Sequence, residues 1–337
     1  MKINPRQNFP LDVYYQQRSA LADVAADPYT LAIIDFGNRS RFSHDKRLII
    51  GTPALAGSHL LEVWRTDEIP ETGVVGEIHY RKTPSLIFGQ ILMDSNIGRI
   101  ESITQDAYRQ INRLQQELDY PQMIRIWNYL SWINRHDDGM ERYQSFCVGR
   151  HQAIDTSQGF ESHLPAATAV GTRDDKVLIY FIAAREDGIQ IENPLQVSAF
   201  DYPARYAPKS PAFSRAIVKQ WGESKHLYIS GTASILGHET RHKDKLLEQL
   251  DECLNNMDVL VAEAHVQTEL GINDTSQLTA IKIYLLPGED LEAVLSHVRK
   301  RLGDELEVLV LSADICRNDL LLEIEGLFSG KKSLLSR

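Results

Sequence analysis

The chain has 337 residues, of which 43% are hydrophobic and 24% are charged, a composition expected for a globular protein of about two or three domains. Its 46 acidic and 36 basic residues give a formal net charge of -10, which argues against general nucleic-acid binding because phosphates need a basic face. No apolar run is long enough to span a bilayer, and residues 1–7 lack the apolar core of a secretion signal.

Cysteine is sparse in this sequence. The three cysteines, Cys147, Cys253 and Cys316, form no pair at metal-ligand spacing. A small, odd number of cysteines indicates reduced thiols rather than disulfides, so we expect a soluble cytoplasmic protein. If the ligand is an anion, particular arginines must bind it against the acidic net charge.

The first half of the chain predicts several strands and two helices. Residues 103–118 carry apolar side chains at helical spacing, and residues 141–154 predict a second helix. Short runs rich in β-branched and aromatic residues predict strands at 31–36, 47–50, 85–93, 123–130, 166–170 and 176–183. The order strand, helix, strand, strand therefore occurs once in this half.

The second half repeats this order of elements. A strand at 225–234 and a helix at 240–257 precede a strand at 280–286, a helix at 290–302, and strands at 306–311 and 319–325. Residues 202–211 contain three prolines and predict an ordered loop between the halves. We expect an α+β fold of two related units, 1–190 with a strand-rich extension and 200–330, although such an order also arises by chance.

The pentapeptide His238–His242 spells the H-E-x-x-H signature of zinc peptidases. That chemistry requires both histidines on one buried helix face, one turn apart. Here Gly237 precedes the motif and Thr240 is typical of a helix N-cap, so the first histidine would lie outside the helix. No third ligand is evident, and we expect no metal site.

Glu323 and Glu325 form a candidate acid site. Residues two apart on a strand share a face, and the neighbouring residues are apolar. A partly buried carboxyl there would have a raised pKa and could act as a general acid near neutral pH. The alternative is an edge strand that carries two solvated glutamates.

Two arginines with aromatic neighbours are candidate anion-binding residues. Tyr143 and Arg150 share a helix face, and Arg215 follows the proline-rich loop that contains Tyr206. Arginine suits a planar carboxylate because it can donate two parallel hydrogen bonds. Considered alone, each arginine is more typical of a surface residue. Cys316, considered alone, is more typical of a small buried hydrophobic residue.

Five segments in order resemble the chorismatase family and span about residues 105–328. They are residues 125–130, 141–150, 206–216, 229–235 and 313–326. The C-terminal unit is also similar to the RidA (YjgF) family, including a Glu-Ile-Glu strand near its end. It lacks the arginine that a RidA deaminase carries in the strand at 306–311, which makes imine deamination less favoured than the fold alone suggests.

The resemblance implies an enzyme without metal or organic cofactor that splits chorismate into pyruvate and a ring acid. It implies that Arg150 and Arg215 hold the two carboxylates of chorismate, helped by Tyr143 and Tyr206. It makes Glu323 the catalytic acid, whereas Glu325 would be supporting or structural. The substrate would also contact three residues of the fourth segment, Gly231, Thr232 and Ala233.

The product of the expected reaction stays open between related compounds. In the family, a cysteine at the position of Cys316 accompanies formation of 3-hydroxybenzoate, but a glycine often stands at the position of Ala233. The alternatives are 4-hydroxybenzoate, a dihydroxycyclohexadiene acid from hydrolysis, and a RidA-like deaminase or small-molecule binder. Two related units in one chain could replace the RidA trimer, so we expect a monomer that binds neither membrane nor nucleic acid.

Overall fold

The N-terminal part of the protein forms a small sheet of its own. The structure is a computed structural model that describes residues 10–43, 46–154 and 160–330. The first elements are β1 (Asp12–Gln17), α1 (Leu21–Ala26), β2 (Thr30–Phe36), β3 (Arg41–Phe42), β4 (Arg47–Ile50), β5 (Ala54–Ala56) and β6 (Leu60–Arg65). All of these strands except β5 form a sheet with the order β1-β6-β2-β4-β3.

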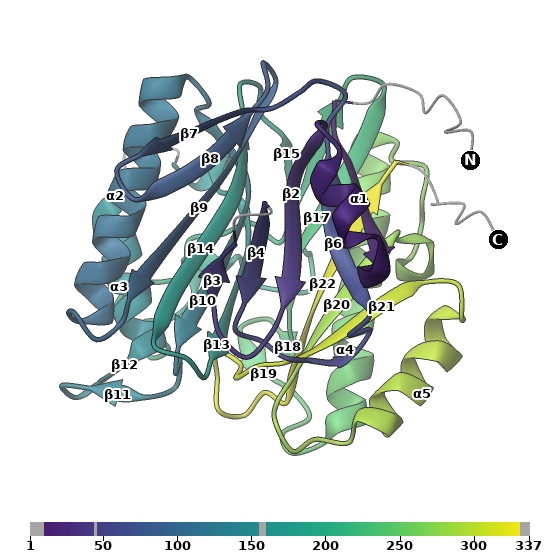
Figure 1. Ribbon diagram of the computed structural model, residues 1–337. Coiled ribbons are helices and arrows are strands. Elements are labelled where there is room, and N and C mark those ends of the chain that lie inside the picture. The colour runs from purple at the N-terminus through teal and green to yellow at the C-terminus, as the bar shows by residue number, and fades with distance from the viewer. Residues whose placement is uncertain (1–9, 44–45, 155–159, 331–337) are drawn as a thin grey trace.

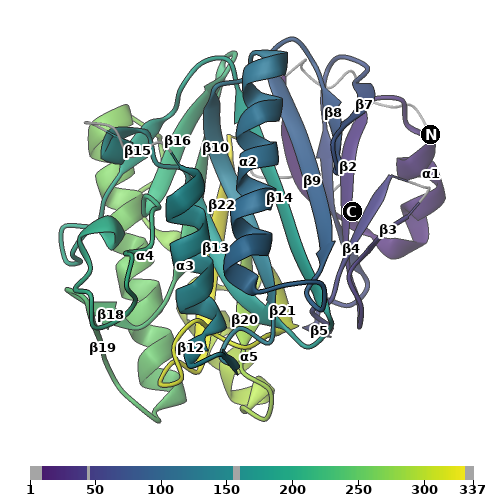
Figure 2. The ribbon, with the colours of Figure 1, turned by 90° about the vertical axis from the view of Figure 1, so that its left-hand side faces the viewer.

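The next part is a mixed six-stranded sheet with two helices. Its elements are β7 (Glu71–Val75), β8 (Ile78–Lys82), β9 (Leu86–Asp94), α2 (Ile100–Leu118), β10 (Gln122–Ser131), α3 (Arg142–Ala153), β13 (Ala166–Thr172) and β14 (Lys176–Ala184), with a small hairpin, β11 (His136–Asp137) and β12 (Met140–Glu141). The strand order is β13-β10-β14-β9-β8-β7, with only the β10–β13 pair parallel. Helices α2 and α3 cover one face of this sheet (Figure 2).

The C-terminal part is a second mixed sheet. Its elements are β15 (Ile189–Ile191), β16 (Ala216–Trp221), β17 (Ser224–Thr232), α4 (Leu246–Thr268), β20 (Ala280–Leu285), α5 (Leu291–Leu302), β21 (Glu307–Ser312) and β22 (Leu322–Ser329), with a hairpin, β18 (Ile235–Leu236) and β19 (Glu239–Thr240). The order is β15-β16-β17-β22-β20-β21-β5, so β5 of the N-terminal part extends it. Short 3-10 helices lie at Arg18–Ala20, Phe160–His163, Ala199–Asp201 and Thr275–Gln277.

The two units have the same topology. In each, three antiparallel strands are followed by a helix, a strand, a helix, a strand parallel to the previous one and a last strand that returns to the middle of the sheet. The predicted α+β class, with two units of mixed sheets packed against helices, is confirmed. We propose that the units divide near residue 190; β15, at this boundary, lies at the edge of the second sheet.

Alternating side chains explain how each sheet is covered on both faces. On β14, Val177, Ile179 and Phe181 pack in the cluster formed with α2 and α3. Leu178, Tyr180 and Ile182 point the other way, into a core shared with the second and N-terminal sheets. The second sheet packs its opposite face on α4 and α5, so the inner faces of the two sheets meet in the middle of the molecule (Figure 1).

This layering determines the direction of the two candidate glutamates. Ile324 on β22 packs in the cluster beneath α4 and α5. Its neighbours Glu323 and Glu325 therefore point to the inner face, and both are buried. The alternative of an edge strand with solvated glutamates is wrong, because β22 lies between β17 and β20.

One predicted helix begins later than the sequence suggested. We expected a helix over 240–257 with Thr240 as its N-cap, whereas α4 spans Leu246–Thr268 and its N-cap is Lys245. Thr240 instead pairs with Ile235 in the β18–β19 hairpin. Backbone pairing overrode the local capping preference of threonine, and residues His242 and Asp244 adopt positive φ before the helix starts. Within the described residues, no helix is both long and apolar enough to cross a membrane.

A substitution of Gly149 on α3 tests the close packing of α3 on α2. A Cβ atom at this position would lie 2.1 Å from the backbone oxygen of Glu101, so we expect Gly149→Ala to push the helices apart. The expected loss in the free energy of unfolding is about 1–3 kcal/mol, measured by urea denaturation. Gly98→Ala is the matched control, because its Cβ would meet Ser102 at an ordinary 3.4 Å. Equal midpoints for the two variants would contradict this packing.

Candidate active site

A cavity of about 780 Å³ lies where the two units meet. Its walls come from β10, β13 and α3 of the first unit and from β17, β19 and β22 of the second. The loop at 202–215 and the segment at 316–319 complete it. The volume is typical of a small-molecule site.

Glu323 lies at the wall of this cavity and is 4% exposed. A Cβ atom on Gly231 would lie 1.9 Å from Oε1 of Glu323, so only glycine allows the carboxyl group its place beside β17. Burial and then the charge of Glu325 raise the pKa of Glu323 to about 8, against the opposing effects of Arg125 and Arg215. Glu323 is therefore mostly protonated at neutral pH.

Glu325 has the opposite environment. Its carboxylate accepts hydrogen bonds from Arg125 at 2.9 Å and from Thr168 at 2.7 Å, and pairs with Lys282 at 2.8 Å. Burial alone would raise its pKa, but Lys282 and Arg125 lower it to about 2. Glu325 is not among the residues that line the cavity, and it stays ionised throughout the physiological pH range.

Two buried arginines in the cavity wall each have an unpaired nitrogen. The Nε atoms of Arg150 and Arg215 are buried and have no hydrogen-bond partner among the described residues. Arg150 lies over the ring of Tyr108, and Arg215 donates to the hydroxyl of Tyr202 and to the carbonyl of Val197. A buried donor without a partner costs free energy, so both atoms are suited to an anionic ligand.

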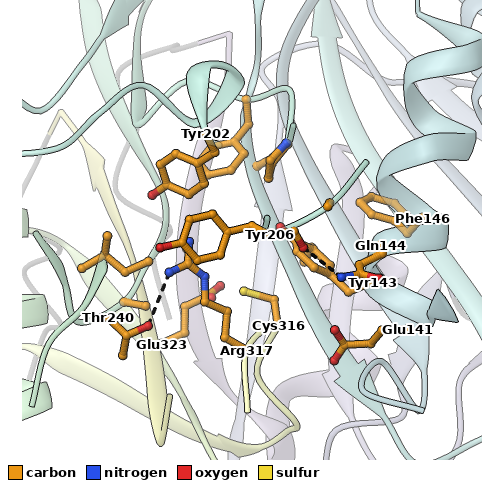
Figure 3. Close-up of a pocket in the computed structure, with 18 of the residues that line it drawn as sticks. Glu141, Tyr143, Gln144, Phe146, Tyr202, Tyr206, Thr240, Cys316, Arg317 and Glu323 are labelled. Carbon is orange, nitrogen blue, oxygen red and sulfur yellow. Dashed lines mark hydrogen bonds between the residues drawn. The ribbon is translucent and has the colours of Figure 1, made fainter. Parts of the chain in front are cut away.

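Aromatic rings and a third arginine form another wall. The guanidinium of Arg317 lies 4.0 Å from the ring centroid of Tyr206 and 5.3 Å from that of Tyr202. It donates to the carbonyl oxygen of His238 at 3.0 Å, and Figure 3 shows its contact with Thr240. These interactions join the loop at 202–211, the β18–β19 hairpin and the segment after β21.

Cys316 and Tyr143 both border the cavity (Figure 3). Burial raises the pKa of the Cys316 thiol, and the neighbouring Glu323 raises it further. The thiol is therefore neutral at physiological pH, and it is not activated as a nucleophile. Tyr143 comes from α3, next to Gln144, whose side chain donates to the backbone oxygen of Tyr206.

The cavity carries a local excess of positive charge in an acidic protein. Its lining includes five basic side chains: Arg150, Arg205, Arg215, Lys243 and Arg317. With Glu323 protonated, it includes three carboxylates: Glu141, Glu239 and Asp319. The arrangement favours a small anion and gives it a proton donor in the same space.

The structure brings nearly all the candidate residues from the sequence to this cavity. Of the nine residues expected to take part in catalysis or to contact the substrate, eight line it: Tyr143, Arg150, Tyr206, Arg215, Gly231, Ala233, Cys316 and Glu323. Thr232 does not, because its side chain points away and donates to the backbone oxygen of Ser230. Adjacent strand residues face opposite ways, so this exclusion could have been predicted once Gly231 was assigned to the cavity.

Arg317 and Tyr202 are the main lining residues that the sequence did not single out. Arg317 follows Cys316 directly and lies in a segment that resembles the chorismatases, which is the one signal that could have found it. Tyr202 lies at the start of the proline-rich loop, outside any such segment. Its role depends on how that loop folds back over Arg215.

The H-E-x-x-H pentapeptide does not form a zinc site. His238 and Glu239 belong to the β18–β19 hairpin, and His242 has a φ of 54° in the turn before α4. His238 instead interacts with the hydroxyl of Tyr206 at 3.1 Å. Across residues 10–43, 46–154 and 160–330, no group of three or more His, Cys, Asp or Glu side chains is placed to hold a metal ion.

The fold and site define a two-unit α+β protein with a protonated glutamic acid in an arginine-lined cavity. Residues 62–183 match the family described as chorismatase FkbO/Hyg5-like, N-terminal. The chain is 36% identical to a 3-hydroxybenzoate synthase of Streptomyces hygroscopicus, over 79% of this chain and 80% of that protein. It is 33% identical to a chorismatase of the same organism, over 92% of each.

A solved structure extends this similarity to the whole fold. A crystal structure of a chorismatase superposes with a TM-score of 0.87 at 32% identity, covering 96% of this chain and 99% of that one. The chain therefore belongs to the chorismatase family. The family, the enzyme class and the fold that the sequence predicted are confirmed.

Proposed function

We propose that this protein cleaves chorismate to pyruvate and 3-hydroxybenzoate. The observation that carries the proposal is Glu323, a buried carboxyl whose pKa is raised to about 8 and which faces a cavity lined by arginines. Chorismate carries two carboxylates and an enol ether, whose cleavage requires a proton donor. Relatives named 3-hydroxybenzoate synthase and chorismatase support this choice of substrate.

Binding of the substrate would use the unpaired arginine nitrogens. We assign the two carboxylates of chorismate to Arg150 and Arg215, whose buried Nε atoms need an acceptor. Tyr143 and Tyr206 border the same space and would contact the ring and the enolpyruvyl group. Arg317 lies on the ring of Tyr206, and so holds one of these walls in place.

The chemistry begins with proton transfer from Glu323. The proton goes to the methylene carbon of the enolpyruvyl group, which leaves an oxocarbenium-like centre on the ether carbon. The ring 4-hydroxyl then attacks this centre, and the bond between that carbon and the ether oxygen breaks, so the ether oxygen stays on C3. Cleavage of the C4–O bond releases pyruvate, and loss of the C3 proton gives 3-hydroxybenzoate. Chorismate has the same atoms as pyruvate plus hydroxybenzoate, so this route consumes no water, whereas attack by water would give a dihydroxycyclohexadiene acid.

Cys316 would decide between these products. Its thiol is neutral, and it borders the cavity near Glu323, so it acts through its volume and low polarity rather than as a nucleophile. An apolar group here disfavours a water molecule beside the reacting carbon and leaves attack to the 4-hydroxyl of the substrate. Ala233, also in the lining, is the second small residue on which the ratio of 3-hydroxybenzoate to 4-hydroxybenzoate would depend.

We also propose a monomer that works in the cytosol. The two units pack inner face to inner face within one chain, and all three cysteines are free thiols. Light scattering of the purified protein is expected to give the mass of one chain. A stable dimer or trimer at micromolar concentration would contradict the monomer.

Replacing the acid tests the main proposal. Glu323→Gln is expected to lower kcat by about 10²–10⁴-fold with little change in chorismate binding, because the amide has no acidic proton to give. In the wild type, kcat/KM is expected to be flat below pH 8 and to fall above it, as Glu323 loses its proton. Pyruvate release measures the rate, and calorimetry with the Gln variant measures binding.

The exposed residue Glu292 on α5 provides the matched control. Glu292→Gln makes the same chemical change far from the cavity and is expected to keep wild-type rates. Near-normal turnover of the Glu323 variant would eliminate the assigned role. Tight binding of chorismate without turnover by the wild type would instead indicate a binding protein.

Replacement of Cys316 tests the product branch. Cys316→Ala enlarges the cavity beside Glu323, so water gains access and the share of the dihydroxycyclohexadiene acid should increase several-fold. Product chromatography after complete conversion of chorismate measures the ratio. Cys253→Ala is the control, since Cys253 is a buried residue of α4 that does not line the cavity. An unchanged ratio in the Cys316 variant would contradict the assignment.

A further inference from the structure

Positive charge near Glu323 opposes its protonation. Arg125 and Arg215 both favour the ionised form of Glu323, yet the proposed reaction needs the protonated form at the start of every turnover. The basic side chains that recruit a dianionic substrate add to this effect. A fixed negative charge near Glu323, outside the substrate space, would counter it.

Glu325 supplies such a charge. It lies two residues from Glu323 on β22, on the same inner face of the sheet. In addition to Arg125, Thr168 and Lys282, the indole nitrogen of Trp127 donates to both of its oxygens, at 3.0 and 3.1 Å. With this many partners and no contact with the cavity, Glu325 cannot itself donate a proton to the substrate.

The N-terminal sheet completes a cluster around this carboxylate. Lys282 on β20 lies 2.8 Å from Glu325 and also 2.8 Å from Glu62 on β6. Glu62 in turn accepts a hydrogen bond from the indole of Trp64 at 2.7 Å. The buried charge cluster of Glu62, Lys282, Glu325 and Arg125 therefore contains two anions and two cations, all at most 5% exposed.

We infer that Glu325 is a positioning residue that keeps Glu323 in its protonated form, and that Glu62 of the N-terminal sheet sustains this by balancing Lys282. The inference rests on the proposed function, since it assigns to Glu323 the role of general acid. It gives the first hundred residues a part in catalysis. Without Glu62, the positive charge of Lys282 would offset more of the field that Glu325 exerts on Glu323.

Four further ionisable groups near Glu323 do not carry charge in the relevant pH range. Tyr284 lies opposite it on β20, and burial raises the pKa of this hydroxyl. Burial also raises the pKa of Cys253 on α4 and of Cys316 and Tyr143 at the cavity. All four are neutral between pH 6 and 9, so the charged groups that shift the pKa of Glu323 are Glu325, Arg125 and Arg215.

The pH dependence of turnover tests the inference. Glu325→Gln removes the negative charge, so the pKa of Glu323 should fall and the alkaline limb of kcat/KM should move to lower pH by about one unit or more. The plateau at low pH should be retained, because Glu323 is protonated there in both proteins. Glu62→Gln, which lies farther from the cavity, should shift the limb in the same direction by less.

Asp35→Asn is the matched control. Asp35 is a buried carboxylate of the N-terminal sheet that pairs with Arg18 and Arg47, outside the buried charge cluster. Its replacement makes a comparable change in buried charge and should leave the alkaline limb in place. A shift of equal size in this variant would show that the effect reflects general destabilisation, and would overturn the inference.

A second readout separates this inference from the proposed function. In protein labelled with ¹³C at the glutamate carboxyls, the signal that Glu323→Gln removes belongs to Glu323, and its titration needs no substrate. We expect that signal to titrate near pH 8 in the wild type and at lower pH in Glu325→Gln and Glu62→Gln. Unchanged titration in both variants overturns the inference, even if chorismate is cleaved. The expected shift without any cleavage would overturn only the proposed function.

Discussion

The arrangement of the molecule depends on charges that are buried between two sheets. Removing a carboxylate or an ammonium group from water costs several kcal/mol, and only close partners offset that cost. Here the partners come from different parts of the chain: Glu325 and Lys282 from the second sheet, Arg125 from the first and Glu62 from the N-terminal sheet. The mutual pairing of these groups requires one particular alignment of the three sheets.

The same inner face gives two neighbouring glutamates opposite properties. Glu325 is surrounded by donors and is held ionised, whereas Glu323 meets Gly231 and the cavity and is held protonated. Their separation along β22 is two residues, so the difference comes from their neighbours alone. A pair of carboxyl groups whose environments drive the pKa values apart is a recurrent way to obtain an acid at neutral pH.

The repeated topology explains why the cavity lies where it does. Each unit covers one face of its sheet with its own helices and leaves the other face for its partner unit. The first unit supplies Tyr143 and Arg150 from α3, and the second supplies Glu323 and Gly231. Neither unit contains the whole site, and the loop that carries Tyr202 and Tyr206 lines a further part of it (Figure 3).

The sequence by itself determined most of the strand and helix order after residue 85 and the family, because periodicity and local segments are properties of short stretches. It left open whether Glu323 and Glu325 face the core or solvent, which the position of β22 inside the sheet decided. It misplaced the start of α4, since the pairing of Thr240 in a hairpin depends on a partner strand. Only the tertiary structure decided that Glu325 is ionised and that Arg317 lies on Tyr206. Those properties depend on contacts between residues up to 200 positions apart in the chain, such as Arg125 and Glu325. A local sequence pattern does not predict which distant residues will be in contact.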